Sequence, residues 1–249
     1  MPASRFLVID ALRGACIVWM TVFHLCFDLT YFGYIRQNFY DDPFWTWQRA
    51  AIVGLFVFTA GLGQALAVAQ KQSWPRFWRR WALVAGGALL VSGGSYLMYP
   101  ASFIYFGILH GIAAMLVVVR LTAGWGRWLV LLGGLAMVAP ELARHAHGIW
   151  PSLEWLNDRI FNWLGLVSRK PVTEDYAPLL PWLGVMWWGM VAGQWVLRNR
   201  PGWLATSLPK PMVALAVLGR WSLTYYLLHQ PILLGGLLAF AKFGRGPGL

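Results

Sequence analysis

Apolar segments long enough to cross a lipid bilayer recur along the whole sequence, and this pattern constrains the fold more than any other feature. A helix needs about 20 mostly apolar residues to cross a hydrocarbon core about 30 Å thick. We predict seven such segments, at residues 7–32, 46–70, 81–100, 103–120, 128–143, 178–197 and 221–241. The expected fold class is all-α, a polytopic bundle of transmembrane helices, and we expect one transmembrane domain over residues 1–249.

The composition agrees with a protein whose main solvent is lipid. Hydrophobic residues make up 59% of the chain and charged residues only 12%. The net charge of +11 would suggest nucleic acid in a soluble protein. Here the basic residues gather in short connections between apolar segments, so we expect membrane lipid as a partner and no nucleic acid. These basic residues are Lys71, Arg76, Arg79, Arg80, Arg120, Arg127, Arg198, Arg200 and Lys210.

The charged loops also predict how the chain is oriented. Loops rich in Lys and Arg mark the cytoplasmic side, which places the N-terminus inside the cell and, with seven crossings, the C-terminus outside. Six acidic residues fall in segments assigned to the outside, at positions 41, 42, 154, 158, 174 and 175. We expect a long external loop at about 144–177, a short interfacial helix at about 209–220 and a multi-pass location in the inner (plasma) membrane. Asp10 and Arg13 interrupt the first apolar run, so a cleaved signal peptide is not expected.

The first predicted span carries four ionisable residues, Asp10, Arg13, His24 and Asp28. At about 100° per residue, Arg13 and His24 differ by only about 20° in direction, and all four groups fall within an arc of about 60°. Charged groups inside a membrane are costly, and they normally face the interior of a bundle or a watery cavity. The spacing therefore predicts a polar stripe along one face of this helix.

The stripe has two interpretations. His24 lies about 16 Å along the helix from Arg13 and so inside the membrane, with Asp28 one turn further on and placed to accept a hydrogen bond from the imidazole. Such a pair suits proton transfer. In the structural alternative, Asp10 pairs with Arg13 to fasten the end of the helix, and His24 with Asp28 joins two helices.

Several segments resemble one known family. IDALRG at residues 9–14, followed by Met20, His24 and FDL at residues 27–29, resembles the opening of the heparan-α-glucosaminide N-acetyltransferase catalytic-domain family. The interval between the arginine and the histidine also resembles related membrane acyltransferases that O-acylate surface sugars. Later segments are similar to signatures of bacterial members, namely YFGIL at 105–109, DYAPLLPW at 175–182, LGR at 218–220 and YLLHQP at 226–231.

The resemblance implies transfer of acetyl from cytoplasmic acetyl-CoA, as co-substrate, to an amino sugar or hydroxyl of a glycan on the far side of the membrane. Arg13 and Asp10 would then lie where the nucleotide phosphates bind. His24 would act either as general base, oriented by Asp28, or as an acyl carrier through a covalent acetyl-imidazole. The sequence leaves both routes open, and a homo-oligomer is compatible with either.

Four more residues are candidates for binding the acceptor. Asp175 and Tyr176 in the long external loop combine a carboxylate with an aromatic ring, which suits a sugar, although an ordinary solvated loop has the same composition. His229 precedes Pro231 in the last span and can line the site or satisfy the backbone at the proline kink. His110 can face the cavity from the fourth span. No metal site is expected.

Two other functions remain open at this stage. The four ionisable groups of the first span can form a proton relay in a proton-coupled transporter. They can also bind a partner helix in a non-catalytic membrane subunit. Gly107 with Gly111, and Gly189 with Gly193, have the spacing that lets transmembrane helices approach closely.

Overall fold

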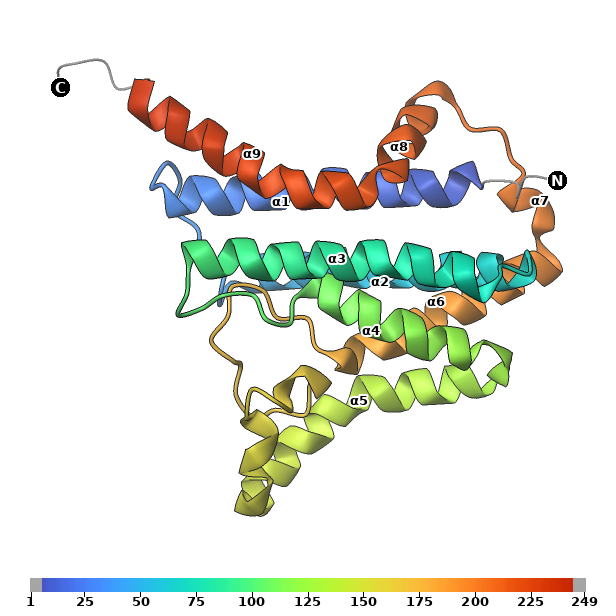
Figure 1. The fold of residues 1–249 in the computed structure, drawn as a ribbon, viewed down its shortest axis with the longest axis horizontal. Helices are drawn as coiled ribbons and strands as arrows, with labels where there is room; N and C mark the ends of the chain where they lie inside the picture. Colours follow the sequence, from blue (N-terminus) through green and yellow to red (C-terminus); the bar gives the residue numbers. More distant parts are fainter. Residues whose placement is uncertain (1–5, 244–249) are drawn as a thin grey trace. The chain divides into compact units, whose positions relative to one another are not determined.

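The computed structural model describes residues 6–243, and helices form most of this part of the chain (Figure 1). One isolated parallel bridge, between Phe106 and Tyr176, is its only β pairing. The predicted all-α class is therefore confirmed. The long helices are α1 (Leu7–Tyr31), α2 (Pro43–Ala69), α3 (Trp74–Met98), α4 (Ile108–Leu121), α5 (Trp128–Ile149), α6 (Leu179–Asn199) and α9 (Ser222–Phe243). The shorter elements are η1 (Ala123–Trp125), η2 (Pro151–Asn157), η3 (Asn162–Leu164), α7 (Pro201–Leu204) and α8 (Lys210–Arg220).

Each predicted span falls on one of the seven long helices. Among residues 6–243, five helices are long and apolar enough to cross a membrane, namely Leu7–Tyr31, Pro43–Ala69, Trp74–Met98, Trp128–Ile149 and Ser222–Lys242. The chain is thus a helical membrane protein. The count of seven crossings and the cytoplasmic N-terminus stay predictions.

The fourth helix begins later than predicted, at Ile108 instead of residue 103. The backbone before it pairs with side chains rather than with a helical turn. Ser92 donates to the Ile104 carbonyl at 2.6 Å, and the Ile104 N–H donates to Ser95 at 3.0 Å. Because these bonds satisfy the backbone outside a helix, the segment before Ile108 stays irregular and α4 has only 14 residues.

The described residues group into two compact units, and the boundary between them falls inside α2, between residues 55 and 56. The first unit comprises residues 56–206, and the second comprises residues 6–55 and 207–243. The single domain expected over residues 1–249 stays a prediction.

In the first unit, glycines bring α6 into close contact with α2 and α5. A Cβ atom on Gly189 would lie 2.2 Å from the Phe58 carbonyl oxygen of α2, and one on Gly184 would lie 2.5 Å from the Gly133 carbonyl oxygen of α5. Gly193 also faces α2, where its Cβ would lie 2.6 Å from the Cβ of Ala65. The helix contact predicted from the spacing of Gly189 and Gly193 is therefore confirmed.

In the second unit, α8 and α9 both pack on α1 (Figure 1). The short helix expected at 209–220 forms as Lys210–Arg220. Its crossing with α1 depends on two glycines, because a Cβ on Gly14 would lie 2.0 Å from the Leu215 carbonyl oxygen and one on Gly219 would lie 1.8 Å from the Asp10 carbonyl oxygen. Backbone therefore meets backbone at this crossing. The position of α8 at the membrane interface stays a prediction.

Candidate functional site

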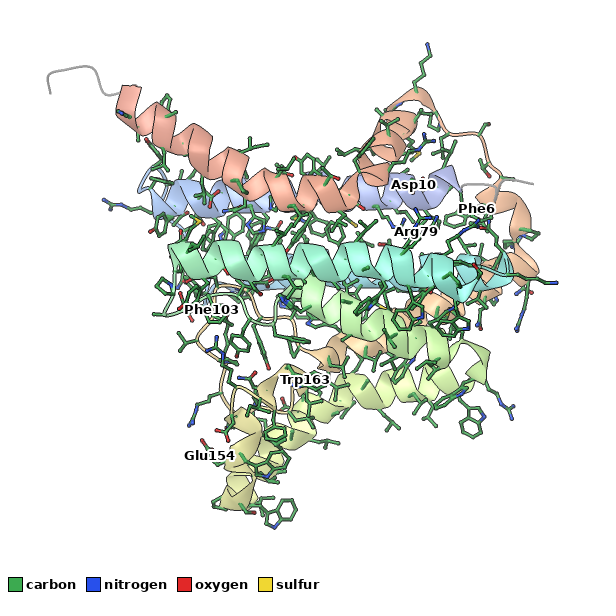
Figure 2. The ribbon with its side chains drawn as sticks, in the orientation of Figure 1. Phe6, Asp10, Arg79, Phe103, Glu154 and Trp163 are labelled. Atoms are coloured by element: carbon green, nitrogen blue, oxygen red, sulfur yellow. The ribbon has the colours of Figure 1, made fainter. Side chains whose placement is uncertain are left out.

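The N-terminal end of α1 carries a cluster of charged side chains around Asp10, whose position is labelled in Figure 2. Asp10 is only 4% exposed. Its Oδ1 lies 3.7 Å from Nη1 of Arg13, and its Oδ2 lies 3.9 Å from Nε of Arg220 on α8. The pairing of Asp10 with Arg13 expected in the structural interpretation is therefore present. Arg220 joins it because the glycine crossing brings α8 onto this turn of α1.

The Asp10 cluster, formed by Asp10, Arg13 and Arg220, has two guanidinium groups and one carboxylate. It therefore carries one positive charge in excess. The two arginine side chains remain 29% and 40% exposed while their carboxylate partner is buried. Planar guanidinium groups held in this way match the geometry of phosphate oxygens. The arrangement is suited to a phosphorylated ligand.

A second polar cluster lies further along α1, where it meets α9. His24 and Asp28 of α1 face His229 and Gln230 of α9. The imidazole centroids of His24 and His229 are 5.0 Å apart, with an angle of 65° between the ring planes. Gln230 Nε2 donates to Asp28 Oδ1 at 2.8 Å. We call these four residues the histidine cluster.

One expectation about this cluster is wrong. Asp28 does not accept a hydrogen bond from His24, and instead it binds the amide of Gln230. Asp28 is only 2% exposed, so its carboxylate needs a donor, and the amide from α9 supplies one that the i,i+4 spacing on α1 does not. The His24 ring packs edge-on against Phe23, with centroids 5.8 Å apart, and against His229.

His229 is held by the backbone of its own helix. Its Nδ1 lies 2.6 Å from the Tyr226 carbonyl oxygen, and its side chain is 7% exposed. The sequence suggested that it satisfies the kink at Pro231, which removes the N–H partner of the Leu227 carbonyl. His229 does bond to a backbone carbonyl in this turn, but that carbonyl belongs to Tyr226 and not to Leu227. Its Nε2 is buried and has no hydrogen-bond partner in the described part of the chain.

Two further residues, which the sequence analysis did not single out, support the histidine cluster. Thr21 on α1 donates to the Ile17 carbonyl at 2.8 Å, so its oxygen accepts the hydroxyl hydrogen of Tyr225 at 2.9 Å. The Tyr225 ring stacks on that of His229, with centroids 6.2 Å apart and an interplanar angle of 11°. Tyr225 therefore fixes the orientation of His229. The LLHQP motif pointed to His229. It did not point to Thr21 and Tyr225, because their contacts depend on how α1 and α9 pack together.

The predicted acceptor residues Asp175 and Tyr176 lie in the other unit and have structural partners there. Asp175 Oδ2 accepts the backbone N–H of Ile108 at 2.8 Å, so it caps the beginning of α4. The Tyr176 hydroxyl donates to the Asn162 carbonyl at 2.6 Å. Burial raises the pKa of this hydroxyl, and neighbouring Tyr105 raises it further, so it stays protonated.

Tyr176 also lines a cavity of about 310 Å³ in this unit. Three of the lining side chains are basic, and at least two of them are paired with glutamates. Arg169 lies 2.5 Å from Glu154, and Arg144 pairs with Glu141. The polar and charged lining residues are Arg144, Ser168, Arg169, Lys170 and Tyr176. Around the same loops, Figure 2 labels Phe103, Glu154 and Trp163.

His110 uses both ring nitrogens at the beginning of α4. Its Nδ1 accepts the Gly107 N–H at 3.2 Å, so Nε2 carries the hydrogen and donates to Ser92 at 3.0 Å. Ser92 in turn donates to the Ile104 carbonyl. His110 thus holds the turn that precedes α4, and its role in binding an acceptor stays a prediction. Within residues 6–243, no group of three or more His, Cys, Asp or Glu is arranged to hold a metal ion.

Comparison with known proteins bears on these clusters. A family model described as heparan-alpha-glucosaminide N-acetyltransferase, catalytic, matches residues 5–231, which confirms the resemblance seen in the motifs. The match includes both the Asp10 cluster and the histidine cluster. No curated protein and no solved structure matches the chain.

Proposed function

Because the chain belongs to the heparan-alpha-glucosaminide N-acetyltransferase catalytic family, and is therefore a membrane transferase, we propose that it acetylates a glycan outside the cytoplasm. The donor is cytoplasmic acetyl-CoA, and the acceptor is the amine of an amino sugar or a glycan hydroxyl. The protein would lie in the inner (plasma) membrane as a multi-pass enzyme. The observation that carries this proposal is that one helix, α1, bears both the Asp10 cluster and the histidine cluster.

The Asp10 cluster supports binding of the nucleotide end of the donor. Arg13 and Arg220 supply two guanidinium groups for phosphate oxygens, and Asp10 holds both side chains in place. His24 lies eleven residues beyond Arg13, which is about 16 Å along a helix. A long, thin pantetheine arm that follows the polar stripe of α1 would bring the thioester to His24.

His24 carries the reaction in either of two ways. In direct transfer, the acceptor nitrogen or oxygen attacks the thioester carbonyl, the His24 imidazole takes the acceptor's proton, and the carbon–sulfur bond breaks with its electron pair leaving on sulfur. In the two-step route, the His24 nitrogen first takes the acetyl group and then passes it to the acceptor. The hydrogen bond between Asp28 and Gln230 joins α1 to α9 beside His24.

The acceptor would enter from the side of the long loop. Tyr176 supports this assignment best, since it lines a cavity together with Ser168 and three basic side chains. Asp175 is adjacent to it in the chain, and we retain Asp175, His110 and His229 as further acceptor-binding candidates. An aromatic ring beside hydrogen-bonding groups suits the apolar face and the hydroxyls of a sugar.

Acetyl transfer by the purified protein tests the proposal. With radiolabelled acetyl-CoA and glucosamine-terminated oligosaccharides, we expect labelled product from the wild type and a loss on the order of 10²–10⁴-fold in kcat for His24→Ala. His145→Ala is the matched control, because that side chain is 73% exposed on α5. Equal turnover by His24→Ala and the wild type would remove His24 from the mechanism.

The alternatives give different results in the same preparation. A proton-coupled transporter would move protons into liposomes without acetyl-CoA, and His24→Ala would stop that flux. A non-catalytic subunit would show neither acetyl transfer nor proton flux. Absence of labelled product with every amino-sugar and hydroxyl acceptor tested would refute the proposed function.

A further inference from the structure

His229 has the features of a proton acceptor, and these are independent of the stripe on α1. A carbonyl oxygen can only accept a hydrogen bond, so the contact between His229 Nδ1 and the Tyr226 carbonyl at 2.6 Å requires the hydrogen on Nδ1. Nε2 then carries a lone pair. This nitrogen is buried, without a partner among the described residues. The backbone of α9 thus fixes the tautomer in which Nε2 is basic.

The orientation of the ring is fixed as well. Tyr225 stacks on the imidazole at an interplanar angle of 11°, and its hydroxyl is anchored to Thr21 of α1 at 2.9 Å. A general base in a catalytic pair is held in the same way, by one group that sets the tautomer and others that set the ring position. His229 has both kinds of support.

His24 has less support of this kind. The carboxylate expected to orient it, Asp28, is bound to Gln230 instead. Its ring is held by aromatic contacts with Phe23 and His229. The two imidazole centroids are 5.0 Å apart. An acceptor hydrogen-bonded to His229 would therefore lie within reach of an acyl group at His24.

We propose that His229 is the base that removes the proton from the acyl acceptor, with Nε2 as the accepting atom. It takes this role in place of His24 in direct transfer, and beside the acyl-carrying His24 in the two-step route. This inference rests on the proposed acetyl transfer and assigns a second catalytic residue to it. The acceptor nitrogen or oxygen forms a bond to the acetyl carbon, and its proton moves to His229 Nε2. In the same step the bond from that carbon to the thioester sulfur, or to the His24 nitrogen in the two-step route, breaks and its electron pair leaves on that atom. His229 then returns the proton to the thiolate or to water.

Substitution of His229 by glutamine tests this role directly. We expect His229→Gln to lower kcat for acetyl transfer on the order of 10²–10⁴-fold, while the affinity for acetyl-CoA stays within about twofold of wild type. In His229→Ala, added imidazole should restore part of the lost rate, because a free base can occupy the space of the missing ring. His145→Gln, at an exposed position of α5, is the matched control and should leave kcat unchanged.

Wild-type kcat in His229→Gln would overturn the inference. A loss of kcat in His229→Ala that imidazole does not restore, while acetyl-CoA binding is retained, would overturn it too. If His229→Gln also fails to bind acetyl-CoA, Tyr225→Phe decides. That variant keeps the stacked ring but loses the hydroxyl bond to Thr21, so a several-fold lower kcat with unchanged acetyl-CoA affinity supports the inference and an unchanged kcat overturns it. A wild type without any transferase activity would refute the proposed function itself, whereas an active wild type with an equally active His229→Gln refutes only the role of His229.

Discussion

Asp28 is a buried carboxylate whose principal support comes from a residue about 200 positions away in the chain. It is 2% exposed, and its Oδ1 accepts the Gln230 amide at 2.8 Å. Its Oδ2 has no hydrogen-bond partner in the described structure. A buried polar group that loses its partner is destabilising by about 1–3 kcal/mol, and a charged one by more. The Asp28–Gln230 bond therefore ties α9 to α1 beside the two histidines.

Gln230→Ala should consequently destabilise the folded protein through Asp28. We expect an increase of about 1–3 kcal/mol in the free energy of the folded state, seen as a drop of roughly 2–10 °C in Tm. The check is a double-mutant cycle with Asp28→Ala, measured by thermal unfolding in detergent. The two substitutions should couple by more than about 0.5 kcal/mol, because each removes the same bond. Strictly additive effects would show that the bond does not stabilise the protein.

Residue spacing alone could predict part of this site. The shared face of Asp10, Arg13, His24 and Asp28 follows from helix geometry, which is local, and α1 forms over all four. The partner of Asp28 does not follow from local geometry, because His24 and Gln230 compete for one carboxylate and tertiary contacts decide between them. Arg220 joins Asp10 for a similar reason, since α8 has to cross α1 first.

At the scale of the elements, the crossing of α1 and α8 determines the Asp10 cluster. A Cβ on Gly219 would lie 1.8 Å from the Asp10 carbonyl oxygen, and one on Gly14 would lie 2.0 Å from the Leu215 carbonyl oxygen. No rotation of a side chain can relieve contact with backbone, so the helices have to separate if either residue is enlarged. Separation would move Arg220 away from Asp10 and weaken the phosphate site proposed there.

Gly219→Ala should therefore raise KM for acetyl-CoA several-fold and lower Tm. Gly235→Ala on α9 is the matched control, because its Cβ would meet no atom within 4 Å. In that control, alanine should leave KM unchanged and Tm equal or slightly higher, since alanine favours a helix over glycine by about 1 kcal/mol. Kinetics over a range of acetyl-CoA concentrations and thermal unfolding measure both effects. Identical behaviour of the two variants would argue against a tight crossing.

The predicted helix boundaries differ from the observed ones where polar contacts outweigh hydropathy. The fifth helix was predicted to end at residue 143 and continues to Ile149. In this extra length Arg144 and His145 pair with Glu141, which lies one turn earlier, with His145 at 3.3 Å. Such pairs at i,i+3 and i,i+4 favour a helix in water as well. Apolar length predicts where a helix can lie in a membrane, but it does not detect a helix that extends beyond the membrane.

For the whole molecule, the number of crossings decides which loops can meet the acceptor. Seven helices match the predicted spans, but five satisfy the length and hydropathy of a span, with α4 too short and α6 outside the set. Both counts are odd, so both place the termini on opposite sides. They differ for the segment between α5 and α6. Seven crossings place it outside with the acceptor, and five place it in the cytoplasm.

Single cysteines at three exposed positions can distinguish these topologies after Cys16 and Cys26 are replaced by alanine. Ser168→Cys reports the loop between α5 and α6, Arg36→Cys the segment before α2, and Thr206→Cys the segment before α8. With seven crossings and a cytoplasmic N-terminus, a membrane-impermeant maleimide added to intact cells should label Ser168→Cys and Arg36→Cys but not Thr206→Cys. The acidic residues of the external loop favour this result, because the loops assigned to the cytoplasm carry basic residues without acids. Labelling of Arg36→Cys alone would show five crossings, and would place the cavity beside Tyr176 on the cytoplasmic side, away from an external glycan.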